Sequence, residues 1–140
     1  MNYNQLFFPF QGQKIMVALI GAGQFGETFI RQCRHISGMR ISFVCDLQPE
    51  RARAALLAAG YDKSAFVSVG SNEEAATAFN KGQIIIASDY CLISGLALDC
   101  VVEATGSPEA AAQVGQITLC LLYTSPSPRD LSTSRMPSSA

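Results

Sequence analysis

Three glycines and one aspartate are the residues of this chain whose types and spacing suggest a chemistry. The glycines belong to the run Gly21-Ala22-Gly23-Gln24-Phe25-Gly26, and Asp46 follows 20 residues after the last of them. Gly21 permits a sharp turn, Gly23 lets a phosphate group approach the backbone, and Gly26 allows a helix to pack closely on a strand. An acid at this distance accepts hydrogen bonds from ribose hydroxyls. The spacing therefore predicts a turn that binds a dinucleotide.

The segments around this turn supply the elements that it requires. Residues 15–20 form a short apolar run rich in branched side chains, a helical pattern covers residues 27–36, and a second apolar run at 41–45 leads to Asp46. A glycine pattern alone is weak evidence, because a strand-to-helix turn without a ligand has the same glycines. Here strand, helix and acid agree, so we favour nucleotide binding.

Asp46 also bears on the choice of cofactor. Alone, it could cap a helix that begins near Pro49, but we favour the ribose role. Its charge would repel a 2′-phosphate, and no basic residue follows it directly. Arg51 and Arg53 stand a helical turn further on, where we expect them in solvent or near the adenine. The predicted cofactor is NAD, with NADP as the alternative.

After residue 46, strand-like and helical segments alternate. Strands are predicted at 66–69, 84–87 and 100–104, and helices at 49–59, 71–80 and 107–114, with one or two helical turns within 90–96. Alternation of this kind produces a parallel sheet with helices on both faces. The predicted fold is α/β, a Rossmann-type doubly wound parallel sheet that is incomplete because the substrate domain is missing.

Ligands of such sheets bind at the carboxyl ends of the strands. The glycine turn and Asp46 should therefore lie near the loop at 104–106, which we expect to approach the middle of the cofactor or the nicotinamide; a plain loop is the alternative. Glu103 is expected to orient this loop rather than act as a catalytic acid. No catalytic or metal-binding residue is predicted. The predicted cofactor-binding residues are Gly21, Gly23, Gln24, Phe25, Gly26, Asp46, Ala104, Thr105 and Gly106.

Composition narrows the class of protein. The chain has 140 residues, 49% of them hydrophobic, and a net charge of −1 without a basic block, so one domain with a core is expected and nucleic acid and membranes are not expected partners. No apolar run approaches the ~20 residues of a membrane span. Residues 2–13 are interpreted as a leader that packs its aromatic side chains on the domain, not as a signal peptide.

Cysteine and histidine usage argues against a metal site. The five cysteines form no C-x-x-C pair, and His35 is the single histidine. Cys45 and Cys100 fall within apolar strand runs, so we interpret them as small core residues. An odd number of cysteines fits a reducing cytoplasm better than a disulfide framework. The predicted location is the cytoplasm.

The end of the chain differs from the rest. From Cys120 on, the sequence reads CLLYTSPSPRD, LST and SRMPSSA, which is rich in Ser and Pro and has no helical or strand period. It could be a disordered tail. It also resembles a one-frame translation of a sequencing-library adapter. We therefore expect residues 1–119 to be an NAD(P)-binding Rossmann domain, a fragment of a longer protein, and residues 120–140 to be non-native.

Three segments resemble a known family. VALIGAGQFG, VCDLQPERARAA and LDCVVEATGSPEAAA, in this order, are similar to the N-terminal half of homoserine-dehydrogenase-like NAD(P)-dependent oxidoreductases that often carry a C-terminal SAF domain. The resemblance covers roughly residues 1–116. It implies hydride transfer on a small hydroxy or keto substrate in the full-length parent. The catalytic lysine and acid of such enzymes lie beyond this chain, so the fragment itself is predicted to be inactive. The matched cofactor residues are Gly21, Gly23, Gln24, Phe25, Gly26 and Asp46, with Thr105 and Gly106 in the later loop.

Two alternatives stay open at this stage. A non-catalytic module that senses NAD(H) would have the same turn, joined to a DNA-binding or channel-gating domain. A dehydrogenase of the sugar or myo-inositol type shares the same first half, and there the missing half should supply a Glu-Lys-Pro sequence, which this chain lacks through Ala140. In each enzyme reading the partner is a small-molecule substrate, and a homo-oligomer remains open.

Overall fold

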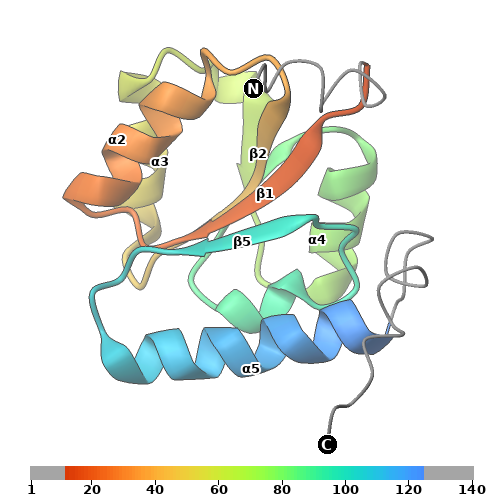
Figure 1. Ribbon diagram of the computed structural model, residues 1–140. Coiled ribbons are helices and arrows are strands. Elements are labelled where there is room, and N and C mark those ends of the chain that lie inside the picture. Colours follow the sequence, from red (N-terminus) through yellow and green to blue (C-terminus); the bar gives the residue numbers. More distant parts are fainter. Residues whose placement is uncertain (1–11, 125–140) are drawn as a thin grey trace, which may run out of the picture.

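The computed structural model of the protein describes residues 12–124, and the side chains of residues 12–120. Residues 2–11 of the predicted leader and residues 125–140 of the predicted tail lie outside the described residues. The elements, in chain order (Figure 1), are β1 (Ile15–Ile20), α2 (Gln24–Cys33), β2 (Met39–Cys45), α3 (Pro49–Ala58), η2 (Lys63–Ala65), β3 (Phe66–Ser68), α4 (Asn72–Asn80), β4 (Ile84–Ala87), η3 (Tyr90–Ile93), β5 (Cys100–Glu103) and α5 (Pro108–Thr124).

The strands form one five-stranded sheet in which every pair is parallel. Their order is β3-β4-β2-β1-β5. β1 pairs along its whole length with β2, from Ile15 opposite Met39 to Ile20 opposite Cys45, and its last four residues pair with β5. This confirms the predicted α/β fold with a parallel sheet, consistent with an incomplete Rossmann-like arrangement.

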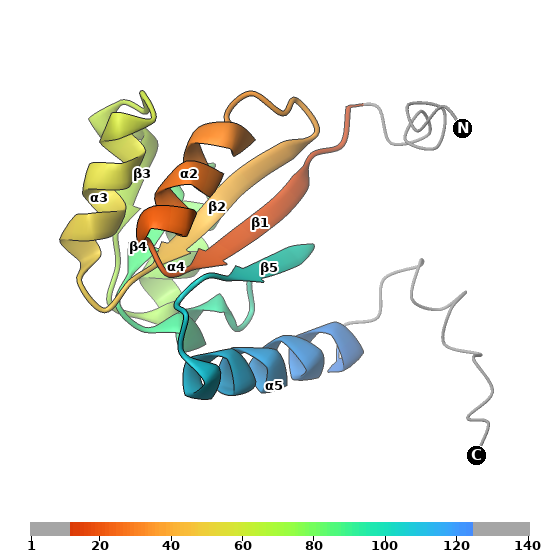
Figure 2. The same ribbon diagram turned by 60° about the vertical axis from the view of Figure 1, so that its left-hand side comes forward.

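Helices cover both faces of the sheet because successive strand residues point to opposite faces. α2 and α3 lie together on one face, and α5 lies on the other (Figures 1 and 2). All four residues of β4 are buried, as predicted for a strand covered on both faces. Burying one large apolar side chain stabilises the fold by about 1.5–3 kcal/mol. The side chains packed between the sheet and the α2–α3 layer include Leu19, Ile30, Ile41, Val44, Leu56 and Ile86, and those on the opposite face include Ile20, Phe43, Ala75, Ile85, Ile93 and Val114.

The strand order contains a change of direction. On one side of β1 lie β2, β4 and β3, in that order. The chain then crosses to the other side of β1 to form β5. In doubly wound sheets, ligands bind outside the carboxyl ends of the strands where the order reverses. In this protein that point lies between the ends of β1 and β5, next to the glycine turn.

Several elements have other bounds than predicted. α2 begins at Gln24, three residues earlier, because Gly23 is already its N-cap, and it ends at Cys33 rather than near residue 36. β2 begins at Met39, two residues earlier than predicted. α5 continues to Thr124, although a helix was expected only to residue 114 and no helical period was recognised from Cys120 on. Val114 and Ile117 both pack on the sheet, so the apolar face of this helix extends further than the prediction assumed. None of the helices within residues 12–124 has the length and apolar character needed to cross a membrane.

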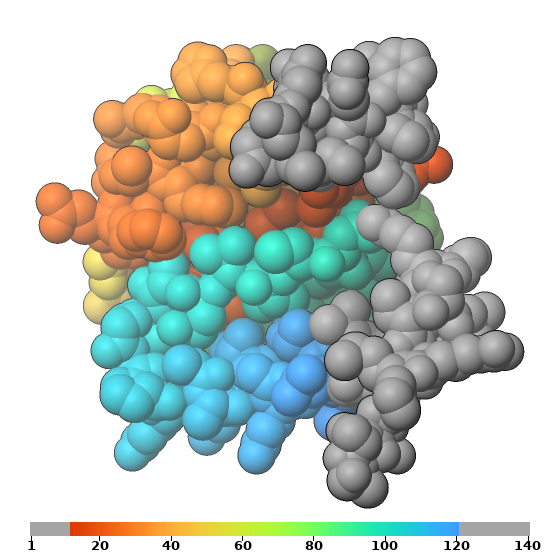
Figure 3. Space-filling model, in the orientation of Figure 1, coloured from red at the N-terminus to blue at the C-terminus, as the bar shows by residue number. Residues whose placement is uncertain are grey.

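The core prediction for the cysteines is right for Cys45 and wrong for Cys100. Cys45 is 3% exposed and ends the central strand β2. Cys100 is exposed, because it begins β5, which is an edge strand of the described sheet. In the space-filling view β5 forms open surface between α2 and α5 (Figure 3). Cys33, Cys45, Cys91 and Cys100 are free thiols.

Candidate functional site

The ends of three adjacent strands meet at the glycine turn. The Gly21 N–H donates a hydrogen bond to the Cys45 carbonyl at the end of β2 (2.7 Å), and the Ala104 N–H after β5 donates to the Ile20 carbonyl (2.7 Å). The turn after β1 is therefore bound on one side to β2 and on the other to β5. We call residues 21–26, Asp46 and residues 104–106 the strand-end cluster.

At Gly21 and Gly26, neighbouring backbone leaves no room for a side chain. Gly21 has φ +102°, and a Cβ on it would lie 2.7 Å from the Ala104 carbonyl carbon and 2.8 Å from the Thr105 nitrogen. A Cβ on Gly26 would lie 2.1 Å from the Gly21 carbonyl oxygen. Real Cβ atoms do not approach other atoms so closely, so the backbone would have to move. The predicted mechanical roles of these two glycines, the sharp turn and the close helix packing, agree with this geometry.

Gly23 presents bare backbone at the start of α2. It is the N-cap of this helix and makes no side-chain cap, and its carbonyl accepts the first helical hydrogen bond, from the Glu27 N–H (2.8 Å). The N–H groups that precede Glu27 in the helix have no intrahelical acceptor. Together with the positive end of the helix dipole, such groups attract an anion.

Gln24 and Phe25 begin α2 and are both exposed. The Phe25 side chain is 62% exposed, and its ring stacks on Phe29 with a centroid distance of 6.4 Å. An exposed aromatic ring at the start of the helix offers a flat apolar surface to a ligand. The structure therefore places these two predicted residues at the helix start, with their side chains accessible.

Asp46 points at the glycine turn. Its Oδ2 accepts a hydrogen bond from the Ala22 N–H (2.8 Å), and its Oδ1 accepts one from the Gln48 N–H (2.8 Å). The N-cap of α3 is Gln48, so the alternative prediction, that Asp46 caps this helix, is wrong. A carboxylate has about four acceptor sites, so each oxygen can still accept a hydrogen bond from a hydroxyl group.

The loop after β5 is held by its own side chains. Glu103 Oε1 accepts hydrogen bonds from the Thr105 N–H (2.7 Å) and from the Thr105 hydroxyl. The Thr105 hydroxyl oxygen accepts one from the Ser107 N–H (3.1 Å), and Gly106 has φ +72°. Glu103 thus orients the loop, as predicted, and Ala104 and Thr105 lie against Gly21.

Arg51 lies closer to the glycine turn than the sequence indicated. It is exposed, as predicted, but one of its guanidinium nitrogens lies 3.5 Å from the position of a Cβ on Gly23. Arg53, two residues later, points elsewhere and contacts the Glu50 carboxylate (3.5 Å) and the Ser68 hydroxyl (2.8 Å). The sequence feature that could have indicated this contact is the position of Arg51 in the first turn of the helix that follows Asp46.

Nucleophilic chemistry by Cys45, the cysteine beside this site, is disfavoured. Burial, followed by the charges of Asp89 and Asp46, raises the pKa of the Cys45 thiol to about 12. The thiolate is the nucleophilic form, so this side chain stays inert at neutral pH. Within residues 12–124 no group of three or more His, Cys, Asp and Glu side chains is arranged to hold a metal ion.

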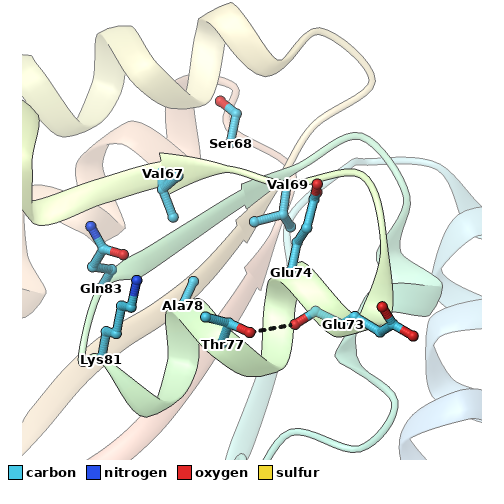
Figure 4. Close-up of a pocket in the computed structure, with 9 residues that line it drawn as sticks. All are labelled: Val67, Ser68, Val69, Glu73, Glu74, Thr77, Ala78, Lys81 and Gln83. Atoms are coloured by element: carbon cyan, nitrogen blue, oxygen red, sulfur yellow. Dashed lines mark hydrogen bonds between the residues drawn. The ribbon is translucent and has the colours of Figure 1, made fainter.

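A separate hollow of about 460 Å³ lies at the other edge of the sheet, between β3 and α4 (Figure 4). Lys81 and Gln83 lie at one end of it and Glu73 at the other. The Glu74 carboxylate accepts a hydrogen bond from the Gly70 N–H (2.8 Å), and the Thr77 hydroxyl donates to the Glu73 carbonyl (2.9 Å). These polar groups stabilise α4, so we assign the hollow no chemistry. Its lining residues are Val67, Ser68, Val69, Glu73, Glu74, Thr77, Ala78, Lys81 and Gln83.

Comparison with known proteins adds no family. No protein-family model matches the chain, and a search of the curated proteins gives no match. The resemblance to homoserine-dehydrogenase-like proteins therefore remains a prediction based on three sequence segments. The fold and the geometry of the strand-end cluster do not depend on it.

Proposed function

We propose that the chain is the NAD(P)-binding part of an oxidoreductase resembling homoserine dehydrogenase, whose full-length parent transfers a hydride to or from a small hydroxy or keto substrate. The observation that supports this best is the Asp46 carboxylate, which accepts a hydrogen bond from the Ala22 N–H within the glycine turn (2.8 Å). It brings an acid and the glycine turn together, the arrangement that a dinucleotide requires for its ribose and its diphosphate.

The residues of the cluster fit the groups of such a cofactor. The N–H groups at the start of α2 and the bare backbone of Gly23 would receive the diphosphate. Asp46 keeps acceptor capacity for the hydroxyls of the adenosine ribose. Residues 104–106 border the turn on the β5 side, where they would face the middle of the cofactor or the nicotinamide. When bound, the nicotinamide supplies the hydride-transfer chemistry.

The charge of Asp46 favours NAD over NADP. A carboxylate that binds the ribose hydroxyls would repel a phosphate on the 2′ oxygen. We accordingly propose NAD as the preferred cofactor and NADP as the weaker one. Catalysis needs a proton relay beside the nicotinamide, and we propose none within residues 12–124, so the chain alone should bind cofactor without turning over substrate.

Titration of the 140-residue chain with NADH tests this function. We expect the NADH fluorescence to rise on binding, and we expect Asp46→Asn to weaken binding about tenfold because a charged acceptor for the ribose is lost. Asp62→Asn is the matched control, since Asp62 is an exposed acid of the α3–β3 connection. A folded wild-type chain that leaves NADH unbound would refute nucleotide binding. Equal affinity of Asp46→Asn and wild type would refute the ribose role.

A second measurement separates binding from turnover. We expect no NADH formation when the chain is mixed with NAD and small hydroxy acids or homoserine, because a proton relay is missing. Substrate-dependent NADH formation by these 140 residues would contradict the proposal that the catalytic groups lie outside the chain.

A further inference from the structure

Arg51 differs from the other arginines of residues 12–124 in having no protein partner there. Arg31 pairs with Glu27 (3.0 Å), and Arg53 contacts Glu50 and Ser68. Arg34 and Arg40 donate to backbone carbonyls. Neither an ion pair nor a hydrogen bond of the Arg51 side chain is found within the described residues. A guanidinium without a partner on a rigid helix is available to bind an anion.

The position of Arg51 is set by the first turn of α3. Pro49 begins this helix, Gln48 is its N-cap, and the Arg51 N–H donates to the Gln48 carbonyl (2.9 Å). From there the side chain reaches across to α2, where a guanidinium nitrogen lies 3.5 Å from the Cβ position of Gly23. A helix of ten residues carries this arginine, so its backbone is well positioned.

Two positive features therefore face one another at Gly23. The N-terminus of α2 carries the positive end of the helix dipole, and the Arg51 guanidinium lies beside it. Without an anion between them these features repel each other. An anion seated on Gly23 would remove this repulsion and would receive charge-assisted hydrogen bonds from both sides.

We propose that Arg51 binds the diphosphate of the dinucleotide and closes the glycine turn from the side of α3. This inference rests on the proposed function. The diphosphate, rather than a 2′-phosphate, is the expected anion because Gly23 is the glycine whose missing Cβ lets the diphosphate approach. Asp46 points toward Ala22 and Gln48 instead, and the ribose would bind at that carboxylate. Arg51 then contributes to binding of NAD and NADP alike.

The choice of arginine over lysine matters in this position. A guanidinium donates two parallel N–H groups to two phosphate oxygens, whereas an ammonium acts as a single point charge. Arg51→Lys should accordingly recover part of the affinity that Arg51→Gln loses. A residue that served only to stabilise α3 would show no such graded effect on binding.

NADH titration of Arg51→Gln in the full chain tests the proposal, with Arg31→Gln as the matched control that removes the same charge from an exposed ion pair. NADH has no 2′-phosphate, so it reports on the diphosphate contact alone. We expect Arg51→Gln to weaken NADH binding about tenfold or more, Arg51→Lys to weaken it less, and Arg31→Gln to leave it within about twofold. The affinity of wild type should also fall more steeply with added salt than that of Arg51→Gln.

The possible results separate the two proposals. If wild type binds NADH and Arg51→Gln binds it equally well, the inference about Arg51 is wrong and the proposed function stands. A loss of affinity confined to NADPH would assign Arg51 to the 2′-phosphate and would also overturn the inference. If the folded wild-type chain binds neither nucleotide, the proposed function fails, and the inference fails with it. If Arg51→Gln folds poorly, NADH binding by Arg51→Lys is compared with that of wild type instead, and equal affinities would again contradict the inference.

Discussion

The turns after β1 and β5 lie side by side and are built in different ways. Both follow a parallel strand, contain a glycine with positive φ, and lead into a helix. The turn after β1 is bound by its neighbours, since the Gly21 N–H donates to Cys45 and the Ala22 N–H donates to Asp46. The turn after β5 is bound by its own segment, through Glu103 and Thr105.

This difference explains what each glycine is for. A Cβ on Gly21 or Gly26 would meet neighbouring backbone at 2.7 or 2.1 Å, whereas a Cβ on Gly106 would meet nothing within 4 Å. Gly106 is needed for its backbone conformation, with φ +72°, and not for space. The first turn is therefore closely packed at both Gly21 and Gly26, whereas the second turn has open space at Gly106.

The largest expected effect comes from filling the space at Gly26. Gly26→Ala should lower the free energy of unfolding by about 3 kcal/mol, because the added methyl group requires the backbone at Gly21 to move. Gly115→Ala is the control within a helix, since a Cβ there meets nothing within 4 Å. It should raise stability by up to about 1 kcal/mol. Urea denaturation measures both, and equal effects would contradict the packing argument.

Alkaline pH should distinguish the buried end of β2 from the exposed start of β5. The Cys45 pKa is raised from 9.0 to about 12, so below pH 9 the thiol is neutral in both states and stability is unaffected. Above pH 9 the unfolded chain loses this proton while the folded chain keeps it. The free energy of unfolding should then fall by about 1.4 kcal/mol per pH unit, up to about pH 12.

The comparison variants are Cys45→Ala and Cys100→Ala, measured by urea denaturation at pH 8 and pH 10.5. Cys45→Ala should lose about 2 kcal/mol less than Cys100→Ala over this interval, because only Cys45→Ala removes the thiol whose pKa is raised to about 12. Cys45→Ala also leaves a small cavity, so the change with pH is compared rather than the absolute stability. Parallel losses in the two variants would show that Cys45 ionises as easily in the folded chain as in the unfolded one.

The smallest expected effect is at Gly106. Gly106→Ala should lower the free energy of unfolding by about 1 kcal/mol, the cost of an L side chain in the left-handed region. Gly106→Asn should lower it less, because asparagine tolerates this conformation. Gly38→Ala, at a loop glycine where a Cβ also meets nothing within 4 Å, should change it by less than about 0.5 kcal/mol. A loss at Gly106 as large as that at Gly26 would remove the distinction between the two turns.

Much of the fold could be predicted because its signals are local. The apolar runs at 15–20 and 84–87 are bounded by turn residues, and β1 and β4 have these same bounds. The position of β4 between β2 and β3 is not a local property. It depends on how α4 packs against the sheet, which hydrophobic period does not encode.

In the candidate site, too, some features could be predicted from the sequence and others could not. The meeting of the glycine turn with Asp46 follows from strand ends that share one edge of a parallel sheet, and it could be predicted. The direction of the Arg51 side chain could not, because it depends on how α3 lies relative to α2. The exposure of Cys100 likewise depends on which element lies beside β5, and this cannot be inferred from the residues of the strand itself.

The two edge strands of the described sheet, β3 and β5, differ in how readily a further strand could pair with them. β3 has three residues and gives an added strand little backbone to pair with, whereas β5 has four residues and emerges at the surface beside α2 and α5 (Figure 3). A strand from any source would be recruited more readily next to β5. Its end would then adjoin Thr105, so growth of the sheet would reshape the loop at residues 104–106 and leave the Asp46 side of the glycine turn unchanged.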